Sequence, residues 1–482
     1  MRRILFALIL AIAPALVVGA TKYVSPTGTA LWAACTTSAT PCALSTAVSN
    51  AAAGDVVVLM DGTYSTGINT SAAGSAGNPV TWRAQNNRKA ILAGLASGAT
   101  GNVIQADAAY HTFDGLVVAV QTGTGSADTF GLFSSGGNII FKNGEIYYAG
   151  DQVVIAPYHA ICAELRALTT FTNNYVHNCT IGVQFYANGA AHASQVTNNT
   201  LKNMDVGLEE DSDCFNMNGS VSASWVGAVL YNNECSGWRD DGFDAFNQDD
   251  MTVTDNYFHD PLLTVKLNTT CLKLGYETSS GVTARRNRCL GLGKYAAQKD
   301  WGLYLVGASS TLNVANVFQG GYIGAEIAQR NSAGGSGNLL YNNDFIGFSA
   351  YAVIVKSGTT GTVLTNNYVD GAAATFGDIN VNSGVTATGS HNLRRHGTDG
   401  GAGTYNKTGD IDGDIQFTVG AGIYGFQLKP SSPAIGAGVF VGPYTDNLGH
   451  RYREPPAIGA YEQAYGSVVS SRSALTKPRI VR

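Results

Sequence analysis

The chain has 482 residues, of which 45% are apolar and only 13% are charged, with 29 Lys and Arg against 34 Asp and Glu. This balance lacks the basic excess of a nucleic-acid binder, and the apolar fraction excludes a globally disordered chain. The 59 Gly against 12 Pro indicate many tight turns without a collagen-like or proline-rich repeat.

The start of the chain is typical of a secretory signal peptide. Basic residues at Arg2–Arg3 precede an apolar run over 4–18, and small residues end the pattern near Ala20. We therefore expect residues 1–20 to be removed and the mature protein to be extracellular or periplasmic. No later segment reaches the ~20 uninterrupted apolar residues of a membrane span, so we expect no membrane span.

Eight cysteines, an even number, suit an oxidising compartment. None shows the C-x-x-C spacing of a zinc site, which favours structural bridges over metal ligation. Spacing alone leaves the connectivity open. The candidate pairs are Cys35 with Cys42, Cys162 with Cys179, Cys214 with Cys235, and Cys271 with Cys289.

One phrase recurs along the chain, in which an Asn precedes a short alternating apolar stretch, as in TNNYV and YNNDF. The intervals between copies run from 23 to 34 residues, which excludes a strict helical repeat. Each interval holds short runs rich in β-branched and aromatic residues, bounded by turn formers. The repeated asparagines are Asn143, Asn174, Asn199, Asn233, Asn256, Asn287, Asn316, Asn343 and Asn367.

Short strands in a variable repeat of this size predict an all-β fold, a single-stranded parallel β-helix whose coils stack ~4.8 Å apart. The recurring Asn is expected to form a ladder from coil to coil, at a turn where left-handed backbone geometry is cheap for Asn. Both ends need caps that cover the core and the strand edges, and we expect a helix over 43–53 at the first end.

This pattern divides the chain into five parts. We expect a signal peptide over 1–20, an N-terminal cap with the first coils over 21–95, the β-helix core over 96–415, a closing segment over 416–466 and a flexible tail over 467–482. The mature protein is expected to be a monomer.

Six short strands can be superposed across the coils: GVQF, CFNM, GFDA, CLKL, GLYL and GAEI. Their second and fourth residues are apolar throughout and must point inward, because alternate residues of a strand face opposite sides. The third position is therefore expected to face solvent. Along the stack it reads Gln184, Asn216, Asp244, Lys273, Tyr304 and Glu326.

Acidic residues accompany two neighbouring strands of this row. Asp213 precedes CFNM, while Asp240 and Asp241 precede GFDA, which itself contains Asp244. Four carboxylates this close would repel one another and raise their pKa values unless a cation neutralised them. Hard oxygen ligands without His or thiolate predict a Ca²⁺ site. The alternative is a solvated acidic turn with a surface ion pair to Lys273.

A calcium site beside a lysine on an open sheet suggests β-elimination on an acidic polysaccharide. The metal would withdraw charge from a uronate carboxylate, and Lys273 as the neutral amine would remove the neighbouring proton. Asp244 favours the ammonium form of this lysine, whereas a bound cation favours the free amine. We therefore expect an activity that needs the metal and rises into the alkaline range.

The stretches DSDCFNM, RDDGFDAF and CLKLG, about one coil apart, resemble the family 9 polysaccharide lyases, which are calcium-dependent pectate lyases on a right-handed parallel β-helix. The resemblance implies Asp213, Asp240, Asp241 and Asp244 as calcium ligands and Lys273 as the base. Cys214 stands where the family usually has Gly, and Leu272 where it has Phe. The motif-bearing region covers about a quarter of the chain.

Other residues are candidates for substrate contact. Tyr304 could stack against a sugar ring and Arg330 could pair with a second uronate, while Trp238 and Trp301 could line the same groove. Three readings compete with a pectate lyase: a lyase for another uronate glycan such as alginate, a β-helix glycoside hydrolase using Asp213 with Asp240 or Asp241, and a non-catalytic glycan-binding protein.

Overall fold

The structure is a computed structural model of the whole chain. It describes residues 19–96, 101–120, 128–150, 159–187, 193–206, 212–219, 225–246, 248–262, 268–275, 279–293, 299–331, 334–371, 377–418 and 426–462. The predicted signal peptide, apart from its last two residues, and the predicted tail over 467–482 lie outside these residues. The proposed division into five parts stays a prediction.

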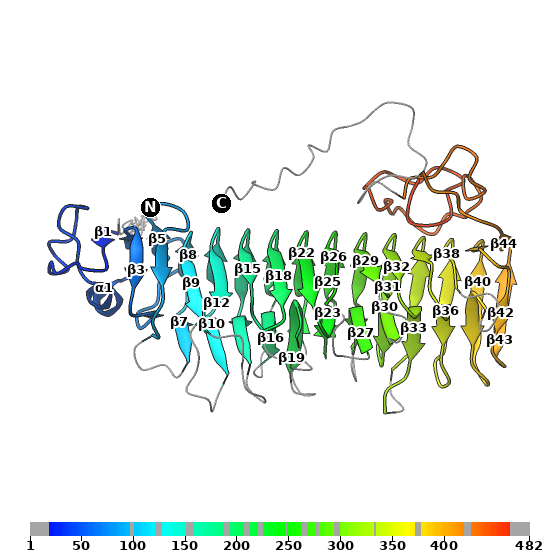
Figure 1. Cartoon of the computed structure of the whole chain (residues 1–482), viewed down its shortest axis with the longest axis horizontal. Helices are drawn as coiled ribbons and strands as arrows, with labels where there is room; N and C mark the ends of the chain where they lie inside the picture. Colours follow the sequence, from blue (N-terminus) through cyan, green and yellow to red (C-terminus); the bar gives the residue numbers. More distant parts are fainter. Residues whose placement is uncertain are drawn as a thin grey trace, which may run out of the picture.

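The described residues form one long solenoid of three parallel sheets, which confirms the predicted parallel β-helix (Figure 1). From β2 onward, and apart from β20 and β24, successive strands visit the three sheets in turn, and neighbouring strands within each sheet are parallel. We name the sheets A, B and C. A two-stranded pair, β20 (Trp225–Val226) and β24 (Gln248–Asp249), lies beside them.

Sheet A has 15 strands. In spatial order they are β1 (Thr21–Val24), β2 (Val56–Leu59), β5 (Val80–Ala84), β8 (His111–Asp114), β11 (Ile139–Lys142), β14 (Thr169–Thr172), β17 (Gln195–Thr197), β21 (Val229–Tyr231), β25 (Thr252–Thr254), β28 (Thr283–Arg285), β31 (Leu312–Val314), β34 (Leu339–Tyr341), β37 (Val363–Thr365), β40 (Thr386–Ser390) and β43 (Thr404–Thr408).

Sheet B has 14 strands. They are β3 (Gly62–Tyr64), β6 (Ala90–Leu92), β9 (Val117–Val120), β12 (Glu145–Tyr148), β15 (Tyr175–His177), β18 (Thr200–Met204), β22 (Glu234–Trp238), β26 (Tyr257–His259), β29 (Arg288–Leu292), β32 (Val317–Gly320), β35 (Asp344–Ile346), β38 (Tyr368–Val369), β41 (Leu393–Arg394) and β44 (Ile411–Asp412).

Sheet C has 13 strands and carries the aligned row. They are β4 (Ile68–Asn69), β7 (Asn102–Ala106), β10 (Thr129–Ser134), β13 (Ala160–Leu165), β16 (Ile181–Ala187), β19 (Phe215–Gly219), β23 (Asp241–Ala245), β27 (Asn268–Leu274), β30 (Lys299–Val306), β33 (Ile323–Ala328), β36 (Tyr351–Val355), β39 (Ile379–Val381) and β42 (Asp399–Gly400).

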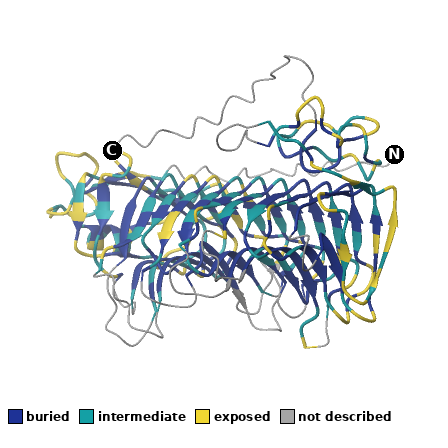
Figure 2. Cartoon of the chain, turned by 45° about the vertical axis from the view of Figure 1, so that its right-hand side comes forward, coloured by how far each residue is buried: buried dark blue, intermediate teal, exposed yellow. Residues whose placement is uncertain are grey.

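The solenoid interior is a continuous column of apolar side chains. In Figure 2 the buried residues, coloured dark blue, run along the length of the coils. At its first end a short helix, α1 (Leu44–Asn50), lies within the range predicted from the sequence. The helix buries Leu44 and Ala47 over the first coils, so it caps the core. No helix among the described residues is long and apolar enough to span a bilayer.

The asparagine ladder runs along the turn between sheets A and B. Each member binds the next, as when Asn233 donates to the Asn256 side-chain oxygen from both its backbone N–H and its side-chain amide at 3.0 Å. Two details of the prediction are wrong. The left-handed residue is the one before each ladder Asn, such as Asn232 with φ 53°. In the FKNGEI turn, Asn143 is that residue, and Gly144 takes the ladder position by donating to Asn174.

The described C-terminal residues pack against the side of the solenoid, above β29 to β44 in Figure 1. Ile458 and Tyr461 are buried in a second apolar cluster with Val317, Tyr368 and Leu393 of sheet B. The segment therefore covers part of sheet B and leaves sheet C on another side of the molecule.

Three disulfides cross the interior and confirm three of the candidate pairs. They are Cys162–Cys179, Cys214–Cys235 and Cys271–Cys289. The fourth pair, Cys35 and Cys42, is not bridged: both are buried thiols, and the Cys42 thiol donates to the Cys35 sulfur at 2.7 Å. Three bridges are consistent with an extracellular or periplasmic protein.

Candidate active site

The strand register of sheet C brings the predicted site residues together. Asp244 of β23 pairs with Lys273 of β27, and Lys273 pairs with Tyr304 of β30. The row predicted from the sequence is therefore reproduced residue by residue, from Gln184 to Glu326. Neighbouring coils place these side chains about one strand spacing, or ~4.8 Å, apart.

One expectation about this row is wrong. The side chains at the third position point away from the core, yet Gln184, Asn216, Asp244 and Glu326 are each 5 to 8% exposed. Side chains that repeat at one strand spacing cover each other along the sheet, so little of each remains accessible to water. The carboxylates of the site are therefore held in a poorly hydrated environment.

The acidic residues meet at the start of β23, where two successive residues face the core. A Cβ at Gly242 would lie 2.8 Å from both the Cys271 carbonyl and the Phe258 ring, so only Gly fits between Asp241 and Phe243. With Gly242 and Phe243 both facing the core, Asp241 and Asp244 emerge on the same outer face although they are three residues apart. In the preceding coil Cys214 and Phe215 face the core in the same way, beside Asp213.

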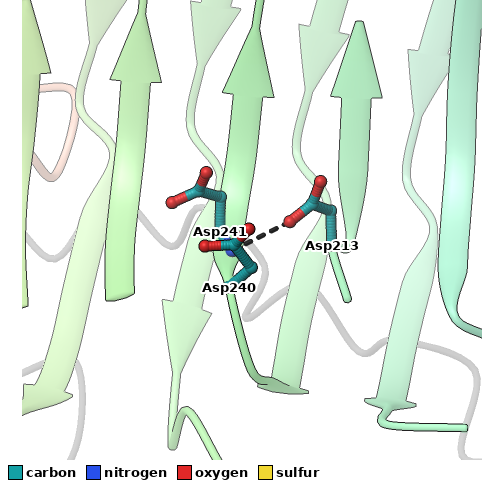
Figure 3. A group of neighbouring side chains, drawn as sticks. All are labelled: Asp213, Asp240 and Asp241. Atoms are coloured by element: carbon teal, nitrogen blue, oxygen red, sulfur yellow. Dashed lines mark hydrogen bonds between the residues drawn. The ribbon is translucent and has the colours of Figure 1, made fainter. Parts of the chain in front are cut away.

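Three carboxylates gather within metal-binding distance (Figure 3). One oxygen from each of Asp213, Asp240 and Asp241 lies within 4.8 Å of the others, and all three residues are buried. Asp213 also accepts a hydrogen bond from the Asp241 backbone N–H at 2.9 Å, drawn dashed in Figure 3, and one from the Asn216 amide at 2.7 Å. These bonds fix the orientation of the Asp213 carboxylate toward its neighbours.

Lys273 binds the other side of the cluster. Its Nζ donates to Asp244 Oδ2 at 2.8 Å and to Asp241 Oδ2 at 3.2 Å, and it lies 5.3 Å from the centre of the Phe246 ring. The lysine side chain is 17% exposed, so it is shielded without being sealed from a ligand on the sheet. Asp241 thus belongs to the group of three carboxylates and also binds the lysine.

The charges of the cluster perturb one another strongly. Burial, and then the charges of Asp240, Asp241 and Asp244, raise the pKa of Asp213 well above its ordinary value. Burial disfavours the Lys273 ammonium, but the carboxylates of Asp241 and Asp244 outweigh this effect and raise the pKa of Lys273. Several carboxylates buried together repel one another unless a cation neutralises them, so the cluster is suited to binding a divalent cation.

The remaining candidates are distributed unevenly. Tyr304 and Trp301 lie in β30, the strand next to that of Lys273, and their rings stack with centres 5.5 Å apart. The Trp301 indole donates a hydrogen bond at 3.0 Å to Glu326, which lies one strand further along, in β33. Arg330 follows β33, where desolvation lowers its pKa and the charge of Asp244 acts in the opposite direction.

Trp238 was a wrong candidate. It belongs to sheet B, is fully buried and packs edge to face on Phe258 at 6.2 Å, so it forms part of the core. Sequence reasoning assigned no role to Phe246 beneath the lysine or to Asn216 on the Asp213 carboxylate. Asn216 was visible as a member of the aligned row, whereas nothing in the local pattern distinguishes Phe246.

Two open hollows of about 540 and 400 Å³ lie on sheet A, near opposite ends of the solenoid. The larger is lined by residues of β37, β40 and β43, and the smaller by residues of β8, β11 and β14 together with neighbouring turns. Neither contains a carboxylate of the cluster. The charged cluster on the elongated sheet C is therefore the stronger candidate for chemistry on a polymer.

Comparison with known proteins shows similarity to solved structures in fold and no match in sequence. No protein-family model and no curated protein sequence matches the chain. A PL6 alginate lyase in complex with a trisaccharide is 12% identical with a TM-score of 0.52, covering 92% of this chain and 96% of that one. The PL6 family alginate lyase AlyGC is 13% identical with a TM-score of 0.54, covering 86% of this chain and 56% of that one.

The pectate lyase Pel9A is 15% identical over 92% of this chain and 96% of its own, with a TM-score of 0.35. The solved structures that share the β-solenoid therefore include polysaccharide lyases. At these identities the similarity concerns the fold alone.

Proposed function

We propose that this protein is a secreted, calcium-dependent polysaccharide lyase that cleaves a polyuronate by β-elimination, with pectate as the first substrate to test. The proposal is supported above all by one observation: the Lys273 amine lies 2.8 and 3.2 Å from carboxylates of a buried acidic cluster on the outer face of sheet C. A cation site next to an amine is the minimum machinery for removing a proton beside a carboxylate.

The donor set fits the proposed metal. Asp213, Asp240 and Asp241 offer three converging carboxylate oxygens and no nitrogen or sulfur, which suits a hard cation such as Ca²⁺. Asp244 is the fourth ligand that the family 9 resemblance implies, although in this structure its Oδ2 binds Lys273. When bound, Ca²⁺ would supply the positive charge that neutralises a uronate carboxylate and acidifies its neighbouring C5 hydrogen.

The chain's own residues then have distinct tasks. Lys273 as the free amine accepts the C5 proton; the electron pair left behind forms the C4–C5 double bond and expels the C4 oxygen as the leaving group. Asp241 and Asp244 hold the lysine in place through their hydrogen bonds. Tyr304 presents a ring for stacking in the adjacent coil, and Arg330 provides a cation beyond it for a second uronate.

A lyase for alginate is the second candidate, because two solved structures that share the fold with TM-scores above 0.5 are alginate lyases. Incubation of the mature protein with pectate, alginate and other polyuronates, with Ca²⁺ or with a chelator, separates these cases. The unsaturated product absorbs in the ultraviolet, whereas a hydrolase releases sugars without that absorbance and a binding protein releases none. Absence of unsaturated product from every polyuronate would refute the proposal.

A further inference from the structure

A second cationic group lies on sheet C at a distance from the acidic cluster. Arg166 directly follows β13, and its guanidinium carbon lies 4.6 Å from the centre of the Phe133 ring and 4.4 Å from that of Tyr186. The two rings belong to the coils on either side, so the guanidinium is enclosed between two aromatic faces. Contacts of this kind fix an arginine that would otherwise be mobile.

One nitrogen of this guanidinium, Nε, is held by a hydrogen bond within the protein. Nε of Arg166 donates to Glu164, whose side chain is only 3% exposed. Among the described residues, this is the one hydrogen bond assigned to the Arg166 side chain. The side chain is 28% exposed. Aromatic rings cover both faces of the guanidinium, and its Nε already donates to Glu164, so the terminal nitrogens are the part of the group available to a ligand. Their two N–H groups can donate a pair of parallel hydrogen bonds to one carboxylate.

The position of Arg166 relates it to the proposed active site. Strands β13, β16, β19, β23 and β27 are consecutive neighbours in sheet C, so Arg166 lies four strand spacings, or about 19 Å, from the coil of Lys273. Tyr186 lies on the same side of the sheet between them, and Phe246 lies under the Lys273 amine. A row of aromatic and cationic side chains thus follows the solenoid axis.

We propose that Arg166 forms a distal subsite for the carboxylate of a uronate unit in the same polysaccharide chain that is cleaved at Lys273. The inference rests on the proposed function, because it takes the ligand to be an acidic glycan running along sheet C. A 1,4-linked uronan advances by about one coil per sugar, so a short oligomer bound at Lys273 cannot reach Arg166, whereas an octamer can. Glu164 acts as the positioning residue of this subsite.

The test compares chain lengths rather than activity alone. Affinities of a trimer and an octamer of the uronan are measured by titration calorimetry in the Lys273→Arg background, so that no cleavage occurs. Arg166→Lys keeps the positive charge but removes the paired terminal N–H groups of the guanidinium. The Glu164→Gln/Arg166→Gln double variant removes both charges, so that no Glu164 carboxylate is left buried without its partner. Lys142→Ala, on sheet A, is the matched control for loss of a surface cation.

Both Arg166 variants are expected to weaken octamer binding about tenfold and to leave trimer binding and the Lys142 control unchanged. A methyl-esterified octamer should show no difference between wild type and variants, because it lacks the carboxylates. Octamer affinity unchanged in both variants would overturn the subsite even if the protein is a lyase. Should the wild type cleave no polyuronate, the proposed function fails, while octamer affinities still decide the subsite independently.

Discussion

At the residue scale, the account depends on one amine among carboxylates. Lys273 bonds Asp241 and Asp244, and those bonds both orient the amine and keep it charged. A base must lose its proton before it can act, so the same contacts that position Lys273 also set the pH at which it works.

Replacing Lys273 separates these two roles. Lys273→Arg keeps a positive charge that can pair with Asp241 and Asp244 but cannot lose a proton, while Lys273→Ala removes both. The lyase rate of each variant is expected to be about 10²- to 10⁴-fold lower than that of wild type. The measurement is the initial rate of unsaturated product formation, with circular dichroism as the check on folding. Lys142→Ala should retain full activity, and an active Lys273→Arg enzyme would rule out the lysine as base.

The direction of the Lys273 pKa shift predicts a pH profile. Because Asp241 and Asp244 raise this pKa above its ordinary value of 10.5, only a small fraction of the amine is free at neutral pH. That fraction, and the rate with it, should increase as the pH rises into the alkaline range. Initial rates at saturating Ca²⁺ between neutral and alkaline pH measure this effect. A rate that does not change over that range contradicts the assignment.

The raised pKa of Asp213 predicts that replacing this residue changes the stability of the metal-free protein and of the Ca²⁺-bound protein in opposite directions. Its pKa is raised above the ordinary 3.8 in the folded protein, so stability without metal falls as the pH rises from that value through the folded pKa. Asp213→Asn removes the buried charge and should stabilise the metal-free protein at neutral pH. It should also lose the gain from Ca²⁺, which for wild type is about 2.7 kcal/mol at a hundredfold excess over Kd.

Thermal unfolding in chelator and in Ca²⁺ measures both effects for the two proteins. The experiment needs no substrate and so tests the cation site separately from the chemistry. Equal responses of wild type and Asp213→Asn to Ca²⁺ would place the cation elsewhere.

At the scale of single elements, sheet C was predictable because its strands follow a simple rule. Apolar residues at the second and fourth positions fixed which side chains face the core, and a change of register by one residue would have exposed them. The structure pairs Asp244 with Lys273 and Lys273 with Tyr304 as the aligned sequences predicted.

The details that the alignment did not predict have different causes. At Gly242 and Cys214, each residue and the one after it both face the core, an interruption of the two-residue period that alternation alone cannot reveal. The low exposure of Asn216 and Glu326 depends on neighbours in other coils, which no single strand specifies. Trp238 was misplaced because, although it is close to the acidic motif in sequence, it ends the preceding strand of the coil, β22 in sheet B.

The contribution of the asparagine ladder to stability can be tested by comparing substitutions at two adjacent residues, Asn232 and Asn233. Asn233 is buried and bonds Asn199, Asn256 and the Val196 carbonyl, so Asn233→Ala leaves buried groups unpaired at a cost of about 1 to 3 kcal/mol each. Asn232, which has φ 53°, should tolerate Gly with little change. Denaturant unfolding of the two variants gives the comparison. Equal destabilisation would show that the ladder adds nothing beyond the turn.

At the scale of the whole molecule, the three disulfides lie in the stretch of coils that leads to the site. Cys214 follows Asp213, and Cys271 precedes Lys273 by two residues in the same strand. Each bridge closes a loop of 17 to 21 residues across the interior, so it restrains the coil whose outer face carries the charged cluster. Away from the site, α1 covers the first end of the core and the C-terminal segment packs on the side of sheet B.

The solenoid also explains how such a site arises from distant sequence. Asp213 and Lys273 are sixty residues apart in the chain, yet one intervening coil separates their strands in sheet C. An open sheet of parallel strands presents a long surface along the axis, which is the shape a polymeric substrate requires. The substrate itself depends on side chains and loops around this surface, and for that reason the sequence motif predicts the chemistry more closely than the glycan.

The most direct measurement is the ultraviolet absorbance of unsaturated products when wild type and Lys273→Arg are incubated with a panel of polyuronates, with Ca²⁺ and with chelator. The account predicts a rising signal only for wild type with Ca²⁺. A signal that persists in chelator or in the arginine variant, or the release of saturated sugars alone, would contradict it.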